Sequence, residues 1–234
     1  MKKMTKLFAL ALLAGAMISC STDDTASSTP NSKVAVQFTG GINVNTRAAG
    51  VAWAEGDKIG IFMTDTKQPL SADAIQEGVD NVCYQTNGSI GFSPVSGGKT
   101  IFYPIDGDVD FYSYYPHTTV SDYKVALDVT DQGKQEAIDF MYAKTPGCNK
   151  ANPQVFLKFF HKLSNLVLEV QPGPGLTEED LKKMTVTVKG QNTKATFNLV
   201  DGTISGEENP ADITMKTTEA GKLYEAILLP TEEA

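Results

Sequence analysis

The chain has 234 residues, with 20 basic and 28 acidic side chains and a formal net charge of −8. An acidic protein is poorly suited to bind nucleic acid or an anionic membrane face, because these carry the same sign of charge. The length suffices for one large domain or two small ones. Beyond the N-terminal segment, no apolar stretch reaches the roughly 18 residues that a membrane-spanning helix needs.

The N-terminus has the order of a secretory signal peptide. Three lysines among the first six residues precede the apolar run Leu7–Ile18, which is too short to span a bilayer as a folded segment. The tetrapeptide that ends in Cys20 resembles the bacterial lipobox, in which cleavage before the cysteine leaves its thiol and amine to be acylated. We therefore expect residues 1–19 to be a lipoprotein signal peptide and Cys20 to carry the lipid that anchors the protein. The alternative is an ordinary signal peptide with an incidental cysteine.

Residues 21–33 lack large apolar side chains and cannot offset their ordering entropy by burial. Residues 20–33 are therefore predicted to form a lipidated, flexible tether. Its acidic start at Asp23 and Asp24 resembles the surface-export signal of Bacteroidetes lipoproteins, which predicts an outer membrane lipoprotein on the cell surface. The alternative is a merely polar linker.

From residue 34 on, short strand patterns alternate with turn residues. Apolar side chains at every second position are typical of half-buried strands, and pairs such as Asn87-Gly88 supply the positive φ that turns need. So many evenly spaced strands, almost without helix, predict an all-β fold of sandwiches. The predicted strands cover residues 34–38, 58–63, 82–85, 100–103, 109–115, 124–129, 140–144, 155–160, 166–170, 185–189, 195–199, 213–216 and 224–229.

One short helix is expected at residues 177–184, where Thr177 precedes three acidic residues and lysines follow. Residues 146–153 are rich in turn formers and interrupt the strand pattern. They predict a domain boundary that divides the chain into an N-terminal sandwich at 34–152 and a C-terminal sandwich at 153–234. A second candidate boundary lies at residues 171–175.

The sequence offers little material for catalysis. His117 is expected on a surface loop and His161 inside an apolar strand as a hydrogen-bonded structural imidazole, and neither lies in a zinc-ligand pattern. Three carboxylates alternate from Asp106 to Asp110, but the glycine and glutamate of an EF-hand are missing, so a hairpin turn explains them better. We expect no enzyme activity, no cofactor and no metal site.

Two features leave alternatives open. Cys83 and Cys148 could pair in an exported protein, or they could be two small, half-buried hydrophobic residues, and their separation in sequence does not decide between these. The aromatic cluster at residues 111–115 could form a sugar-binding face, although alternating aromatic residues in a strand more often pack in a core.

A series of short motifs follows one order along residues 34–230: Phe38, Thr46-Arg47, Trp53, Gly56–Met63, Ile101–Pro104, Asp110–Pro116, Phe160–Ser164 and Lys194–Leu199. No single motif is diagnostic. Together, behind a lipobox, they resemble the fimbrillin family of Bacteroidetes, the Mfa-like fimbrial lipoproteins. The resemblance implies a pair of transthyretin-like β-sandwiches, export as a lipidated precursor and assembly into a surface fimbria.

In the family's polymerising subunits, a protease cuts after an arginine or lysine in the loop that follows the first strand. A strand from another subunit then fills the groove that is left. In this chain residues 34–38 are a strand that could be removed, and residues 45–50 are small and of the kind that proteases enter. Arg47 is the only arginine of the chain, so we predict cleavage between Arg47 and Ala48. The alternative is that threonine-arginine is common in this family, including in members that are never cut there.

The resemblance thus implies other fimbrial subunits as partners, through strand exchange, and the outer membrane through the lipid. Trp53 and the turn at Gly56-Asp57 are expected to serve folding. Relatives usually continue for further strands after residues 225–230, so the second sandwich is expected to be incomplete or the sequence cut short. The alternative function is a surface glycan-binding lipoprotein, whose partner is a glycan or host receptor and which uses exposed aromatic residues such as Tyr112, Tyr114 or Tyr115.

Overall fold

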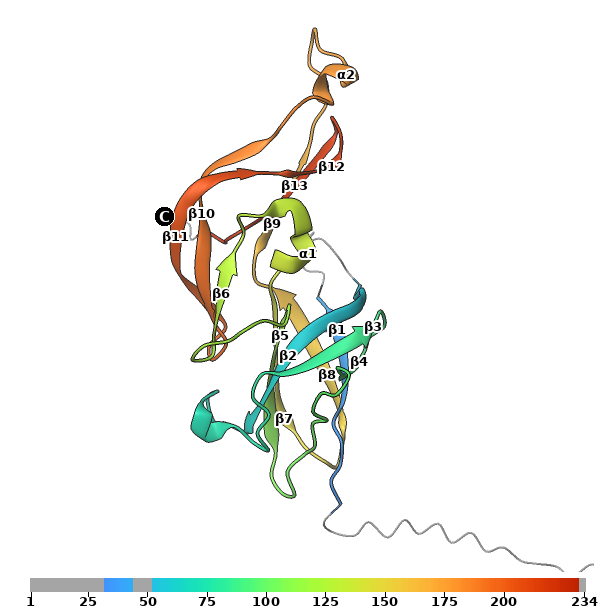
Figure 1. Ribbon diagram of the computed structural model, residues 1–234, viewed down its shortest axis with the longest axis vertical. Coiled ribbons are helices and arrows are strands. Elements are labelled where there is room, and N and C mark those ends of the chain that lie inside the picture. Colours follow the sequence, from blue (N-terminus) through green and yellow to red (C-terminus); the bar gives the residue numbers. More distant parts are fainter. Residues whose placement is uncertain (1–31, 44–51, 232–234) are drawn as a thin grey trace, which may run out of the picture. The chain divides into compact units, whose positions relative to one another are not determined.

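A computed structural model describes residues 32–43 and 52–231 of the chain. Seven of the described strands form a closed barrel in the order β1-β4-β3-β2-β5-β7-β8 (Figure 1). All neighbours in the barrel are antiparallel except β1 and β8, which run parallel. The barrel strands are β1 (Gln37–Ile42), β2 (Glu55–Asp65), β3 (Val82–Asn87), β4 (Gly91–Pro94), β5 (Val109–Tyr115), β7 (Met141–Cys148) and β8 (Gln154–His161).

The remaining described strands form two sheets of three strands each. The first has the order β11-β10-β6 and contains a long hairpin whose register shifts twice, and the second has the order β12-β13-β9. These strands are β6 (Lys124–Asp128), β9 (Ser164–Glu169), β10 (Thr187–Asn198), β11 (Thr203–Thr214), β12 (Lys216–Glu219) and β13 (Leu223–Leu228).

Helical segments are short. Within the described residues, two 3-10 turns cover Ala72–Ala74 and Gln132–Lys134, and the α-helices are α1 (Gln135–Ile138) and α2 (Glu178–Leu181). The helix predicted from residue 177 on is confirmed in a shorter form, since Thr177 and Asp180 form a capping box at the start of α2. Across the part of the chain that the structure describes, no helix is long and apolar enough to cross a membrane.

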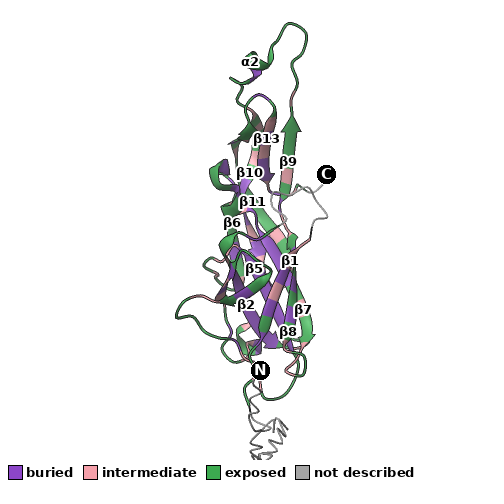
Figure 2. Cartoon of the chain, turned by 90° about the vertical axis from the view of Figure 1, so that its right-hand side faces the viewer, coloured by how far each residue is buried: buried purple, intermediate pink, exposed green. Residues whose placement is uncertain are grey.

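Two hydrophobic cores share strand β5. Phe111 and Tyr115 of β5 belong to the core inside the barrel, whereas Tyr112 and Tyr114 belong to a second core with side chains of β6, β10 and β13. Successive side chains of a strand point to opposite faces. Each face of β5 lies in a core, so β5 is buried along its whole length (Figure 2). The second core therefore packs against the outer face of the barrel.

The predicted all-β class is confirmed. The strand pairing, however, crosses the position at which the sequence places the domain boundary. β8 follows residue 152 and pairs with β7 and β1 in the barrel, whereas β6 precedes residue 152 and pairs with β10 outside it. Alternating apolar residues identify a strand but do not determine its neighbours, so topology could not be read from that pattern.

Candidate assembly site

β1 lies in the barrel between β8 and β4 and pairs with both. Its parallel register with β8 runs along its whole length, from Gln37 to Ile42. Its antiparallel pairing with β4 aligns Phe38 with Phe92. A strand with two neighbours has no free edge, so β1 completes the barrel.

Hydrogen bonds extend this pairing beyond both ends of β1. The Val36 N–H donates to the Ile101 carbonyl at 3.0 Å, and the Val34 carbonyl accepts from the N–H of Tyr103 at 2.9 Å. After β1, the Asn43 N–H donates to the Phe159 carbonyl at 2.8 Å. Residues 34–43 therefore form one extended segment that is held on both sides.

Alternate positions of this segment enter the barrel core. Positions 36, 38 and 40 are buried, whereas positions 35 and 37 are exposed. The Phe38 ring lies edge-on to the rings of Tyr84 and Phe111, with centroids 5.4 and 5.0 Å apart. Burial of a phenylalanine side chain contributes about 1.5–3 kcal/mol, so side-chain packing holds the segment in addition to its hydrogen bonds.

Trp53, which follows residues 44–51 in the sequence, contacts the same segment. Its indole N–H donates to the Gly40 carbonyl at 2.9 Å. Its ring lies edge-on to those of Phe92, Phe159 and Tyr115, with centroids 5.1, 5.2 and 5.5 Å away. The expected folding role of Trp53 as a buried anchor is confirmed.

The turn at Gly56-Asp57 supports Trp53. The Asp57 carboxylate accepts from the Ala54 N–H at 2.7 Å and from the Tyr115 hydroxyl at 3.1 Å. Burial, and then the neighbouring Asp57 carboxylate, raises the pKa of Tyr115. Gly56 adopts a φ of +87°, which favours glycine. These contacts confirm that the turn serves folding.

The residues predicted to be modified are not among those that the structure describes. Cys20, Arg47 and Ala48 all lie outside residues 32–43 and 52–231. The structure gives instead the two ends of the segment that contains Arg47, at Asn43 and Ala52. One end leaves β1 and the other leads directly into Trp53.

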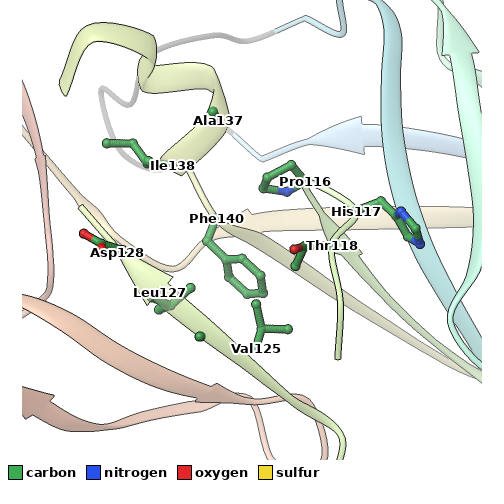
Figure 3. Close-up of a pocket in the computed structure, with 10 residues that line it drawn as sticks. Pro116, His117, Thr118, Val125, Leu127, Asp128, Ala137, Ile138 and Phe140 are labelled. Carbon is green, nitrogen blue, oxygen red and sulfur yellow. The ribbon is translucent and has the colours of Figure 1, made fainter. Parts of the chain in front are cut away.

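A hollow lies beside β6 and has a volume of about 410 Å³ (Figure 3). Residues 125–128 of β6 line it, together with Pro116–Thr118, Phe140 and the end of α1. His117, expected on a surface loop, is half-buried, and its ring stacks on that of Tyr114. Burial lowers the pKa of His117. This hollow could not be predicted from the sequence, because it depends on which strands pair.

The tyrosines considered as a sugar-binding face are not exposed. Tyr112 and Tyr114 are 0% exposed and Tyr115 is 7% exposed. β5 has a core on each face, so neither side of the strand meets solvent. The favoured interpretation, that these aromatic residues pack in a core, is confirmed, and the alternative of a sugar-binding face is wrong. The alternative glycan-binding function therefore loses the aromatic surface on which it was based.

Polar groups considered for chemistry have structural roles. His161 Nδ1 lies 2.8 Å from Asp139 Oδ1, and both side chains are buried, which confirms His161 as a structural imidazole. Asp110 accepts from the Thr66 hydroxyl and the Gly147 N–H, and so links two neighbouring segments of the barrel. Within residues 32–43 and 52–231, no three His, Cys, Asp or Glu side chains are grouped so that they could hold a metal ion.

Cys83 and Cys148 are free, half-buried thiols. Burial raises the pKa of both, to about 11 for Cys148. A nucleophilic cysteine needs a lowered pKa, so neither thiol is activated. Of the two alternatives left open by the sequence, the structure shows the pair of small hydrophobic residues.

Comparisons with known proteins agree with the motifs. The model of the fimbrillin-like family matches residues 46–234. A Bacteroides uniformis protein provisionally named fimbrium subunit Fim1C is 37% identical over 241 residues, which is 96% of this chain and 73% of that protein. Among solved structures, a provisionally assigned cell adhesion protein from Bacteroides uniformis superposes with a TM-score of 0.71 at 35% identity, over 85% of this chain and 76% of the other. Another, from Bacteroides ovatus, shares the fold with a TM-score of 0.67 at 24% identity, over 87% and 80% of the two chains. This chain belongs to the fimbrillin-like family.

Proposed function

We propose that this protein is a fimbrial subunit of the cell surface and that residues 34–43 are a replaceable strand of its barrel. One observation carries the proposal: this segment is bonded along both edges and packed into the core, yet only residues 44–51 join it to the rest of the barrel. Those residues include Arg47. Cleavage after Arg47 would leave the segment held by non-covalent contacts alone.

Departure of the segment would open a slot between β8 and β4. The backbone groups of both strands that now bond to β1 would lose their partners, and Tyr84 and Phe111 would lose the Phe38 ring. An extended strand from another subunit, with apolar side chains at alternate positions, would restore both sets of contacts. The role of the protein in this scheme is structural rather than catalytic.

Export as a lipidated precursor is the second part of the proposal, and sequence alone supports it. Residues 1–19 would direct export, Cys20 would carry the lipid, and residues 20–33 would link the lipid to β1. Cleavage after Arg47 would then cut the covalent link of both the lipid and the replaceable strand to the barrel in a single step. The subunit would become free to assemble when the cut strand leaves its slot.

The two smaller sheets favour a second, incomplete sandwich as the finer description of the fold. β9 is an outer strand of its sheet, and among the described strands it pairs only with β13. It exposes 40% of Leu166, 43% of Val167 and 37% of Leu168. Successive apolar residues on both faces of an edge strand are what further strands would cover. We propose that β6 and β9–β13 belong to a transthyretin-like sandwich that further strands complete, and that the barrel is the other.

The first test is the N-terminus and mass of the protein recovered from the surface of its native host. We expect chains that begin at Ala48 and carry no lipid. The variant Arg47→Gln should instead keep acylated Cys20 and stay out of fibres, because its slot remains filled. Wild-type chains that begin at acylated Cys20 and yet form fibres would contradict activation by cleavage.

A further inference from the structure

The slot that holds residues 34–43 contains one position at which there is no room for a side chain. A Cβ added to Gly40 would lie 2.9 Å from Cε2 of Phe92 and 3.3 Å from Cε2 of Phe159. Gly40 is not among the glycines with positive φ. Glycine is therefore required at this position by the space available and not by the backbone conformation.

The two rings that fill this space have little freedom to move aside. Both lie edge-on to the indole of Trp53, and Phe92 and Phe159 are 7% and 0% exposed. Closely packed interiors resist added atoms, because a displaced ring must push the next group in turn. A methyl group at position 40 would thus disturb the whole aromatic cluster around Trp53.

Trp53 also fixes the backbone at this position. Its indole N–H, which can only donate, is bonded to the Gly40 carbonyl, while the Gly40 N–H donates to the Ile90 carbonyl at 2.7 Å. A strand in a shifted register would still have to place a carbonyl against the buried indole, since an unpaired buried donor is costly. The steric and hydrogen-bonding requirements meet at the same residue of the strand.

We infer that the slot selects incoming strands by requiring glycine opposite Trp53, two residues after the large apolar side chain that takes the place of Phe38. The partner that fits is an extended segment of another subunit with apolar residues at alternate positions and a glycine at this one. The inference rests on the proposed strand exchange and adds to it a rule for which strands enter and in which register.

Gly41 supplies a matched control. A Cβ added there would lie 2.8 Å from Cζ of Phe156, a contact as short as the one at Gly40. Phe156, however, is 55% exposed, and the atom is the far end of its ring. The ring can turn into solvent, so the same substitution one residue later should be tolerated.

The experiment uses the full chain cut after Arg47 by an arginine-specific protease. The cut protein is mixed with fluorescent peptides of residues 32–43, in mild denaturant that lets the original segment exchange. We expect the natural peptide and its Gly41→Ala variant to bind alike, and the Gly40→Ala variant to bind at least about tenfold more weakly. Equal binding by the two variants would overturn the selection rule and leave strand exchange standing. Failure of the natural peptide to bind after release of the original segment would count against strand exchange itself.

The intact, uncut chain gives a second test that does not depend on exchange. Gly40→Ala should lower the urea midpoint of unfolding clearly more than Gly41→Ala does, because the segment occupies the same slot. Equal midpoints would remove the steric basis of the inference, whatever the peptides do.

Discussion

β1 and β5 both lie between two hydrogen-bonded neighbours of the barrel, but they differ in what they bury. Every residue of β5 is buried, because one face belongs to the barrel core and the other to the second core. β1 sends only one face into a core, and Gln37 on its other face is exposed. Loss of β1 would open one side of one core, whereas loss of β5 would open both.

This difference indicates where a fold of this kind can release a strand. A replaceable strand must be bonded well enough to complete the sheet and yet must not hold two layers together. β1 meets both conditions, and β5 fails the second. Strand exchange therefore fits the edge between β4 and β8 and would unfold the protein at β5.

The largest losses of stability are expected from substitutions at a contact between the two strands, the edge-on pair of Phe38 and Phe111. Phe38→Ala and Phe111→Ala should each lower the free energy of unfolding of the intact chain by about 3–5 kcal/mol, since each leaves a cavity in the same core. Urea denaturation followed by far-ultraviolet circular dichroism measures both.

Cleavage after Arg47 should make the two variants diverge. Phe38→Ala should speed release of residues 1–47 by more than about a hundredfold while the barrel stays folded. Phe111→Ala should in addition lower the unfolding temperature of the barrel that remains. Release can be followed by the fluorescence of Trp53, the only tryptophan, which contacts β1. Unchanged release in Phe38→Ala would mean that the barrel core does not hold β1.

A smaller effect tests the hydrogen bond between Trp53 and β1. Trp53→Phe keeps an aromatic ring but removes the N–H that binds the Gly40 carbonyl, and should lower the free energy of unfolding by about 1–2 kcal/mol. Tyr103→Phe is the control: its hydroxyl is buried in the same core and makes no hydrogen bond to any described residue. Its removal should leave stability unchanged or slightly higher. An equal loss in both variants would show that the indole bond has no specific role.

Much of the strand pattern could be predicted, because alternation of apolar residues depends only on the burial of one face. The segments predicted at 124–129 and 155–160 match β6 and β8 within one residue at each end. At 100–103 only Phe102 forms an isolated bridge, to Ala35. β4 (Gly91–Pro94) was not predicted, since it contains glycine, serine and proline, which are typical of turns.

Only some residues of the candidate site could be identified from the sequence. Trp53 and Phe38 are large apolar residues and could be assigned to a core from their type alone. The role of Gly40 could not, because a glycine carries no sign of which side chains occupy its missing volume. Phe92 and Phe159, which do so, come from strands whose pairing with β1 is non-local. For the same reason the two-sided burial of β5 was missed.

The smallest expected effect is a pH dependence of stability at His117, which follows β5 and packs on the second core. Its ring stacks on Tyr114 of the second core, and burial lowers its pKa below the ordinary 6.5; nearby Lys58 acts in the same direction and a backbone hydrogen bond involving Asn81 opposes it. Below about pH 6.5 the unfolded chain binds a proton that the folded protein resists. The stability due to neutral His117 is thus complete above that pH and is lost as the pH falls through it.

The urea midpoint of the wild type should therefore fall slightly more than that of His117→Gln between about pH 7.5 and about pH 5.5. Because His117 packs on the second core, cleavage after Arg47 should leave this difference unchanged, and a difference that disappears on cleavage would show that the second core depends on β1.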